Sequence, residues 1–149
     1  MLSFPEVNEL SDDVRRVFEE LDRCHGAASP AATGVYTPAL DVVETAASVE
    51  VLVDLPGVPV SALRVLFKNG ALIIAGEKLG PEQRGPECAA FHLVERGFGR
   101  FARVIRLAIA IDAGRTTASL RSGELRVSIP RIAERRGEEI VVRVEPATA

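Results

Sequence analysis

The sequence predicts an all-β fold, an immunoglobulin-like antiparallel β-sandwich with a short N-terminal amphipathic helix and an extended C-terminal tail. Between Pro38 and Pro130 the dominant hydrophobic period is two, and turn dipeptides separate the short runs that show it. Many short strands with no helical pattern between them are typical of such a sandwich. The composition divides the 149 residues into an N-terminal arm (1–36), a sandwich domain (37–132) and a C-terminal extension (133–149).

The predicted helix covers residues 10–21, where apolar side chains recur at helical spacing. These side chains are Leu10, Val14, Val17, Phe18 and Leu21. Ser11 is a candidate N-cap, and Asp12 and Asp13 fall in the first turn, where acidic residues stabilise a helix. The small-residue stretch 27–34 contains Pro and Gly and is typical of a flexible linker, so we expect the helix to end near Gly26.

The sandwich strands follow from alternation of apolar and polar residues. Strands are expected over residues 48–55, 63–68, 71–75, 101–107, 117–121 and 125–129. In the first of them Val49, Val51 and Val53 share the buried face. Asn69-Gly70 is the dipeptide most favoured in a type I′ hairpin turn, and Ser122-Gly123 marks a second tight turn.

Two further segments stand out by composition. Residues 79–90 hold two prolines, two glycines and mixed charges, which predicts a long exposed excursion and excludes a central strand. After a charged stretch, alternation returns in Ile140, Val142 and Val144. An extended segment of this kind can dock on a sheet edge of another copy, or it can fold back as an edge strand of its own sheet. Periodicity fits both arrangements equally.

Composition also limits the classes of function. The formal net charge of −3 argues against nucleic-acid binding, which usually requires an excess of basic residues. No stretch approaches the roughly 18 consecutive apolar residues of a membrane span. The N-terminal residues lack the basic start and apolar middle of a secretory signal, so a cytoplasmic protein is expected. The separated Cys24 and Cys88 are expected to be reduced thiols.

The sequence offers little to support catalysis. The two histidines, His25 and His92, have poor support as members of a nucleophile and base pair. Cys24-His25 lacks the further ligands of a zinc site. We therefore expect no enzyme activity, no metal and no cofactor. A sandwich enzyme or ligand-binding protein ranks last, because no concave polar site can be assembled from the residues present.

Arg103 is the one charge on an otherwise apolar strand face, which it shares with Phe101 and Ile105. A buried arginine is tolerated when it meets a carboxylate or a subunit boundary. The alternative is that the side chain lies near the end of the sheet and extends to water. Of the two, the pattern favours a subunit interface.

The chain resembles the α-crystallin domain of bacterial and plant small heat-shock proteins over residues 36–132, and three blocks within this range carry the resemblance. TPALDVVETAASVEVLVDLPGV resembles the start of that domain, where L-P-G-V closes the first long strand. FHLVERGFGRFARVIRL resembles its E-R-x-x-G-x-F-x-R segment through Glu95, Arg96, Gly99, Phe101 and Arg103. ASLRSGELRVSIPR resembles its A-x-x-x-x-G-x-L-x-V-x-x-P segment through Ala118, Gly123, Leu125, Val127 and Pro130.

The resemblance implies an ATP-independent chaperone, a holdase that binds partly unfolded proteins and prevents their aggregation under heat or other stress. Its partners would be client proteins and further copies of itself, first as a dimer and then as a larger homo-oligomer. The excursion would carry a strand exchanged with the partner. The implied dimer interface consists of Phe91, His92, Leu93, Glu95 and Arg103.

The resemblance also implies that an I-x-I or I-x-V tail motif docks in a groove of another dimer. Ile140, Val142 and Val144 are the candidate motif. The candidates for the accepting groove and for client contact are Val65, Phe67, Ala118, Leu120, Leu10, Val14, Val17 and Phe18. For the helix, packing on its own sandwich is an equally supported alternative to client contact.

The sequence departs from the family pattern in two places. Ala108 stands where the family usually has Pro, and the tail has Val where Ile is common. The alternative function is a related co-chaperone module, a monomeric sandwich that recognises a folded partner.

Overall fold

The computed structural model describes residues 4–25, 36–80, 92–133, 139 and 141–142. Within these ranges the chain forms one α-helix, two short 3-10 helices and seven strands. The helices are α1 (Phe4–His25), η1 (Val60–Ala62) and η2 (Ala113–Arg115). The strands are β1 (Leu40–Glu44), β2 (Ser48–Asp54), β3 (Leu63–Lys68), β4 (Ala71–Lys78), β5 (Gly99–Arg106), β6 (Thr117–Arg121) and β7 (Glu124–Pro130).

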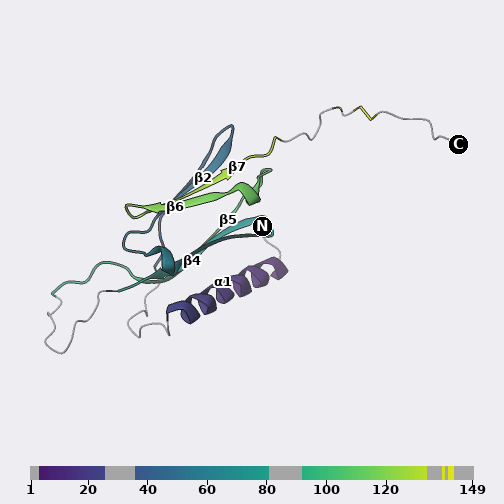
Figure 1. Cartoon of the computed structure of the whole chain (residues 1–149). Helices are drawn as coiled ribbons and strands as arrows, with labels where there is room; N and C mark the ends of the chain where they lie inside the picture. Colours follow the sequence, from purple (N-terminus) through teal and green to yellow (C-terminus); the bar gives the residue numbers. More distant parts are fainter. Residues whose placement is uncertain (1–3, 26–35, 81–91, 134–138, 140, 143–149) are drawn as a thin grey trace.

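The strands form two antiparallel sheets, one with the order β1-β2-β7-β6 and the other with the order β3-β4-β5. Figure 1 shows the two sheets as separate layers, with α1 lying beneath the layer that contains β4 and β5. The predicted antiparallel sandwich is therefore confirmed.

The core between the sheets comes from the predicted alternation. Val49, Val51 and Val53 on β2 are buried, while the residues between them are half-buried on the outer face. In the register of β2 with β7, Val51 lies opposite Val127. From the second sheet, Leu72 and Ile74 of β4 enter the same core. A half-buried strand with one apolar face is stable only when a second layer covers that face.

The two predicted tight turns have the required backbone conformation. Asn69 and Gly70 have φ angles of 50° and 73°, and Ser122 and Gly123 have φ angles of 50° and 78°. Positive φ at both central residues is the requirement of a type I′ turn, which joins twisted antiparallel strands without distortion. The first turn fixes the register of β3 on β4, and the second fixes that of β6 on β7.

The helix is longer than the sequence pattern predicts. It begins at Phe4 and ends at His25, so Ser11 lies inside it and is not its N-cap. The apolar spacing starts only at Leu10 and does not mark the earlier turns. Pro5 is compatible with a start at Phe4, because a first-turn residue needs no amide hydrogen for the helix.

Two further elements differ from the expectation. β4 continues to Lys78, three residues beyond the predicted end, because its last three residues pair with residues 99–101 of β5. β1 was not expected, since most of its residues are exposed and it has no clear alternation. In the tail, Val141 and Val142 belong to no strand and are 83% and 77% exposed. Ile140 and Val144 lie outside the described residues.

Candidate functional site

A groove of about 290 Å³ lies between the edge strands β3 and β6, on the open side of the sandwich. Its lining is mostly apolar and consists of Val65, Leu66, Phe67, Ala113, Thr116, Thr117 and Ala118. Three of the residues predicted for a tail-accepting groove, Val65, Phe67 and Ala118, are thus brought together. The fourth, Leu120, is half-buried against the core and does not line the groove.

The groove follows from the packing of two edges. Val65 and Phe67 point toward the sandwich interior but are only partly buried, because no further strand of the described chain covers their side of β3. β3 pairs with β4 on one side, so its other backbone edge is available to an added strand. An extended peptide can place alternate side chains into pockets beside such an edge.

The sequence pattern missed one wall of the groove. Ala113 and Thr116 come from η2 and the residue that follows it, where the chain has neither alternation nor helical spacing. Thr117 begins the predicted strand 117–121 but was not among the residues predicted for the groove. Thr116 and Ala113 are joined by a backbone hydrogen bond, which fixes this short 3-10 turn against the strand. A short turn has no hydrophobic periodicity, so the sequence does not indicate that η2 lines the groove. Its position is known only from the packed structure.

Arg103 lies on the interior side of β5, opposite Ile74 of β4, as the face pattern predicts. Its guanidinium donates a 2.7 Å hydrogen bond to the carbonyl oxygen of Pro38, just before β1. The cation therefore joins the second sheet to the segment that enters the first. A half-buried charge is compensated here by a charge-assisted hydrogen bond to the backbone.

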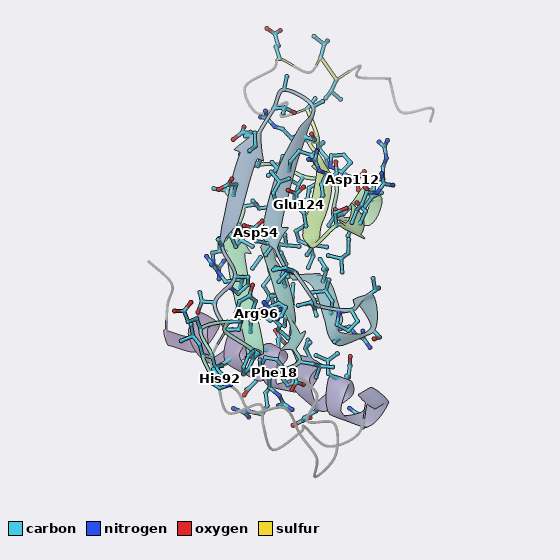
Figure 2. The ribbon with its side chains drawn as sticks, turned by 90° about the vertical axis from the view of Figure 1, so that its left-hand side faces the viewer. Phe18, Asp54, His92, Arg96, Asp112 and Glu124 are labelled. Atoms are coloured by element: carbon cyan, nitrogen blue, oxygen red, sulfur yellow. The ribbon has the colours of Figure 1, made fainter. Side chains whose placement is uncertain are left out.

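The residues predicted for a dimer interface are in part described. His92, Leu93 and Glu95 are exposed in a stretch without regular structure, and Leu93 is 74% exposed. Figure 2 shows His92 and Arg96 at the end of the sandwich away from Asp112. Phe91 lies outside the described residues. An exposed leucine of this size is an apolar surface that a second subunit can cover.

A compact cluster anchors the point where the excursion leaves the sandwich. Lys78, the last residue of β4, is buried, and its ammonium lies 4.7 Å from the ring centroid of Tyr36. The Tyr36 ring contacts Phe101 edge to face. Burial, and then the nearby Asp54 carboxylate, raise the pKa of Tyr36, and its hydroxyl donates a 3.2 Å hydrogen bond to the Asp54 carbonyl oxygen.

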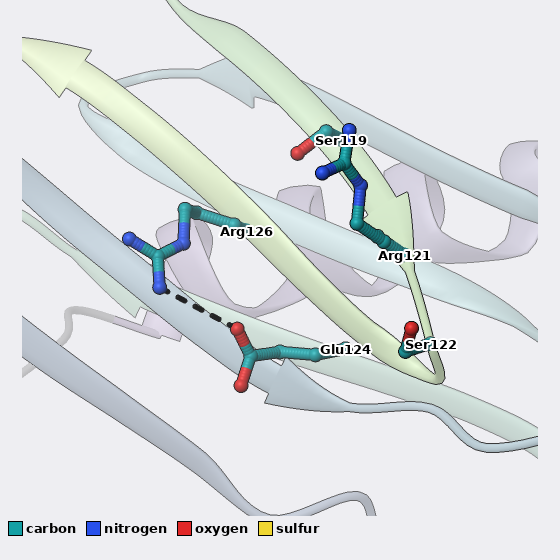
Figure 3. A pocket seen from close by; sticks show the side chains of 5 residues that line it. All are labelled: Ser119, Arg121, Ser122, Glu124 and Arg126. Carbon is teal, nitrogen blue, oxygen red and sulfur yellow. Dashed lines mark ion pairs between the residues drawn. The ribbon is translucent and has the colours of Figure 1, made fainter.

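A second hollow lies on the outer face of β6 and β7 (Figure 3). All five of its lining side chains are exposed and polar: Ser119, Arg121, Ser122, Glu124 and Arg126. Arg126 pairs with Glu124 at 3.6 Å. An open, solvated ion pair of this kind contributes little binding energy.

The apolar face of α1 packs on its own sandwich. Val17 is buried, and Phe18 is half-buried beside it at the contact with the sheet (Figure 2). Val14 packs against Ala71 and Ile73 of β4. Of the predicted client contacts on the helix, the side chain of Leu10 lies outside the described residues. The described chain therefore adopts the second of the two arrangements expected for this helix.

No helix in the described part of the chain has the length and hydropathy to cross a membrane. Within the same ranges, no group of three or more histidine, cysteine or acidic side chains is placed to hold a metal ion.

The chain is similar to small heat-shock proteins in sequence and in structure. The model of the Hsp20/alpha crystallin family matches residues 41–145. The 21.9 kDa heat shock protein of Oryza sativa is 34% identical, over 93% of this chain and 74% of the relative. Heat shock protein 16 of Schizosaccharomyces pombe is 34% identical, over 66% and 69%.

Two solved structures support the same comparison. Heat shock protein 16.0 from Schizosaccharomyces pombe has a TM-score of 0.62 and 32% identity, covering 74% of this chain and 99% of that one. A small heat-shock protein from Xylella fastidiosa has a TM-score of 0.63 and 28% identity, covering 76% and 98%.

Proposed function

Because the chain belongs to the Hsp20/alpha crystallin family, whose members are ATP-independent chaperones, we propose that it is a holdase for partly unfolded proteins. It binds clients under heat or other stress and keeps them soluble. The observation that carries the proposal is the family match over residues 41–145, which includes both walls of the apolar groove between β3 and β6.

The groove supplies the chemistry that holding requires. Unfolding proteins expose extended apolar segments, and an open strand edge beside apolar pockets binds such segments through backbone hydrogen bonds and side-chain burial. This recognition depends on no particular client sequence. We propose that Val65, Phe67 and Ala118 make these contacts when the groove is vacant.

The same groove is the proposed dock for the tail of another subunit. Val142 is 77% exposed in the single chain, so its apolar side chain is accessible to the groove of another subunit. In an extended conformation Ile140, Val142 and Val144 would share one face, and their apolar side chains suit the mostly apolar groove beside β3. Docked tails would both link dimers and cover the client groove at rest.

The dimer is proposed to form through residues 79–93 together with Glu95 and Arg103. Support comes from the exposed Leu93 and from the buried Lys78, which fixes the start of this segment. The solved Xylella fastidiosa relative is described as having a distinct high order structure, in keeping with a larger homo-oligomer. A cytoplasmic setting is proposed because the two separated cysteines suit a reducing compartment.

The test is suppression of heat-induced aggregation of an unrelated enzyme, followed by light scattering without ATP. We expect scattering to fall as the chain is added and to be unaffected by ATP. An equal mass of an inert protein serves as the control. Undiminished scattering with several clients, at several ratios of chain to client, would contradict the proposal. The monomeric co-chaperone alternative would then be favoured.

A further inference from the structure

The outer face of the β3-β4-β5 sheet is apolar along its centre and is covered by α1. In β4, Ala71, Ile73 and Ala75 point outward, and all three are fully buried. Val17 and Leu21 of α1 are 3% and 5% exposed and pack against Ala75. A sheet face of this composition is therefore buried by a helix instead of by a second sheet.

Basic residues surround this apolar centre. The cross-strand register places Lys68 and Arg106 on either side of Ala71, and Arg64 on the same face beside Ala75. Arg100 lies opposite Glu77 at the far end of the face. All four cations are engaged in interactions. The face thus combines an apolar strip with a basic rim.

The occupant of the face has the opposite charge. α1 carries seven acidic residues against three arginines, a formal charge of −4 with His25 neutral. Asp13 has a side chain only 8% exposed, and its Oδ1 accepts a 2.6 Å hydrogen bond from the Lys68 ammonium. Asp12, the next residue, is mostly exposed and pairs with Arg15 on the solvent side.

A second contact lies toward the other end of the helix. The Arg100 guanidinium lies 5.1 Å from the ring centroid of Phe18. Asp13 Oδ2 is buried and has no hydrogen-bond partner among the described residues, so this carboxylate depends on Lys68 for its compensation. When the helix shifts and the Asp13–Lys68 pair opens, the buried Asp13 carboxylate is left without compensation among the described residues, which favours its exposure to water.

We propose that the outer face of the β3-β4-β5 sheet is a binding site for acidic amphipathic helices, and that α1 is its resident ligand. Release of α1, controlled by the Asp13–Lys68 pair, opens the face to helical segments of unfolding clients. This rests on the proposed holdase function and adds to it a second site, distinct from the groove between β3 and β6. The groove takes extended segments, and this face takes helices.

A reversible disulfide between α1 and β4 tests whether α1 must leave the sheet before a helical client can bind. Val17 and Ala75 belong to one contact cluster, so Val17→Cys with Ala75→Cys, in a chain carrying Cys24→Ser and Cys88→Ser, is designed to bind the helix to β4 by a disulfide. Thiol titration and mass measurement verify the bond. With a largely helical client, we expect the oxidised chain to protect about tenfold less well than the same chain after reduction.

The reduced chain is the internal control for folding and for the holdase function. Equal protection by the oxidised and reduced chains would overturn the resident-helix proposal while leaving the holdase function intact. Absence of protection in both states would count against the holdase function instead.

Charge variants test the pair without a disulfide. Asp13→Lys places two cations together and is expected to release α1, raising the binding of an apolar dye, whereas Asp12→Lys makes the same charge change on the solvent side and is expected to leave dye binding unchanged. Combining Asp13→Lys with Lys68→Asp is expected to restore the low level. Equal dye binding by the Asp12 and Asp13 variants, or no rescue, contradicts the proposal.

The ligand class is tested with peptides added to the full chain. A peptide of residues 4–25 should compete with a helical client about tenfold better than the same peptide with its acidic residues changed to Asn and Gln. Equal competition by both would show that the basic rim does not select the ligand.

Discussion

A chain cut after Arg131 is expected to be a dimer, with twice the mass of one chain, whereas the intact chain forms a larger assembly. The cut removes the proposed docking strand but leaves Arg131, whose backbone bridge to Ile111 closes the sandwich. The sandwich and the residues proposed for dimerisation are retained. Size-exclusion chromatography with light scattering measures both masses. An unchanged large species after truncation would show that the tail does not link the dimers.

Substitutions within the tail separate docking from tail length. Val141 and Val142 are both highly exposed in the single chain, so replacing either by Glu leaves the fold unaffected. They point to opposite faces of an extended segment. Val142→Glu places a charge in the apolar groove and is expected to reduce the assembly to dimers. Val141→Glu adds the same charge on the other face and is expected to leave the mass unchanged.

Gly76→Ala is expected to lower the free energy of unfolding by about 3 kcal/mol, at the upper end of overpacking effects. A Cβ at this position would lie 2.4 Å from the Ala62 carbonyl oxygen and 2.8 Å from Phe101 Cζ. The first of these atoms belongs to the backbone of η1, so relief requires movement of the main chain. For a chain of this size, the midpoint of thermal unfolding should fall by about 6–12 °C.

Gly114→Ala is the matched control. A Cβ at Gly114 meets the Asp112 side chain at 3.5 Å, an ordinary contact, and Gly114 lies exposed in η2. The same substitution is expected to change the stability by less than about 0.5 kcal/mol. Both variants are compared with the parent at one protein concentration, because assembly adds to apparent stability. An unfolding midpoint for Gly76→Ala within 2 °C of the control's, well under the expected shift, would mean that β4 and η1 are not packed as described.

Much of the fold could be predicted because each strand carries its own signal. Alternation in residues 48–54 marks the buried face of that strand. The Asn69-Gly70 dipeptide specifies a turn whose two central residues have positive φ, a conformation that Asn and Gly adopt at low energetic cost. Such signals are local, and the packed structure preserves them. The start of α1 was placed too late because helical spacing marks only the turns that carry apolar residues.

The functional surfaces were harder to predict, because they depend on contacts between distant residues. Val65 and Ala118 were assigned to one groove through the family resemblance, and Thr116 entered it only through the packing of η2. The partner of Asp13 is Lys68, 55 residues away, and neither residue has a pattern that distinguishes it from an ordinary surface charge. The basic rim around β4 likewise becomes visible only from the strand register.

The most direct test of the holdase function is whether a heated client is recovered in a soluble complex with the chain. The client is heated with and without the chain in the absence of ATP, and the soluble fraction is separated by size-exclusion chromatography with light scattering. We expect the client to elute with the chain in particles larger than either protein forms separately. Loss of the client to the pellet, or its elution as free protein while the chain elutes separately, would contradict the proposed function.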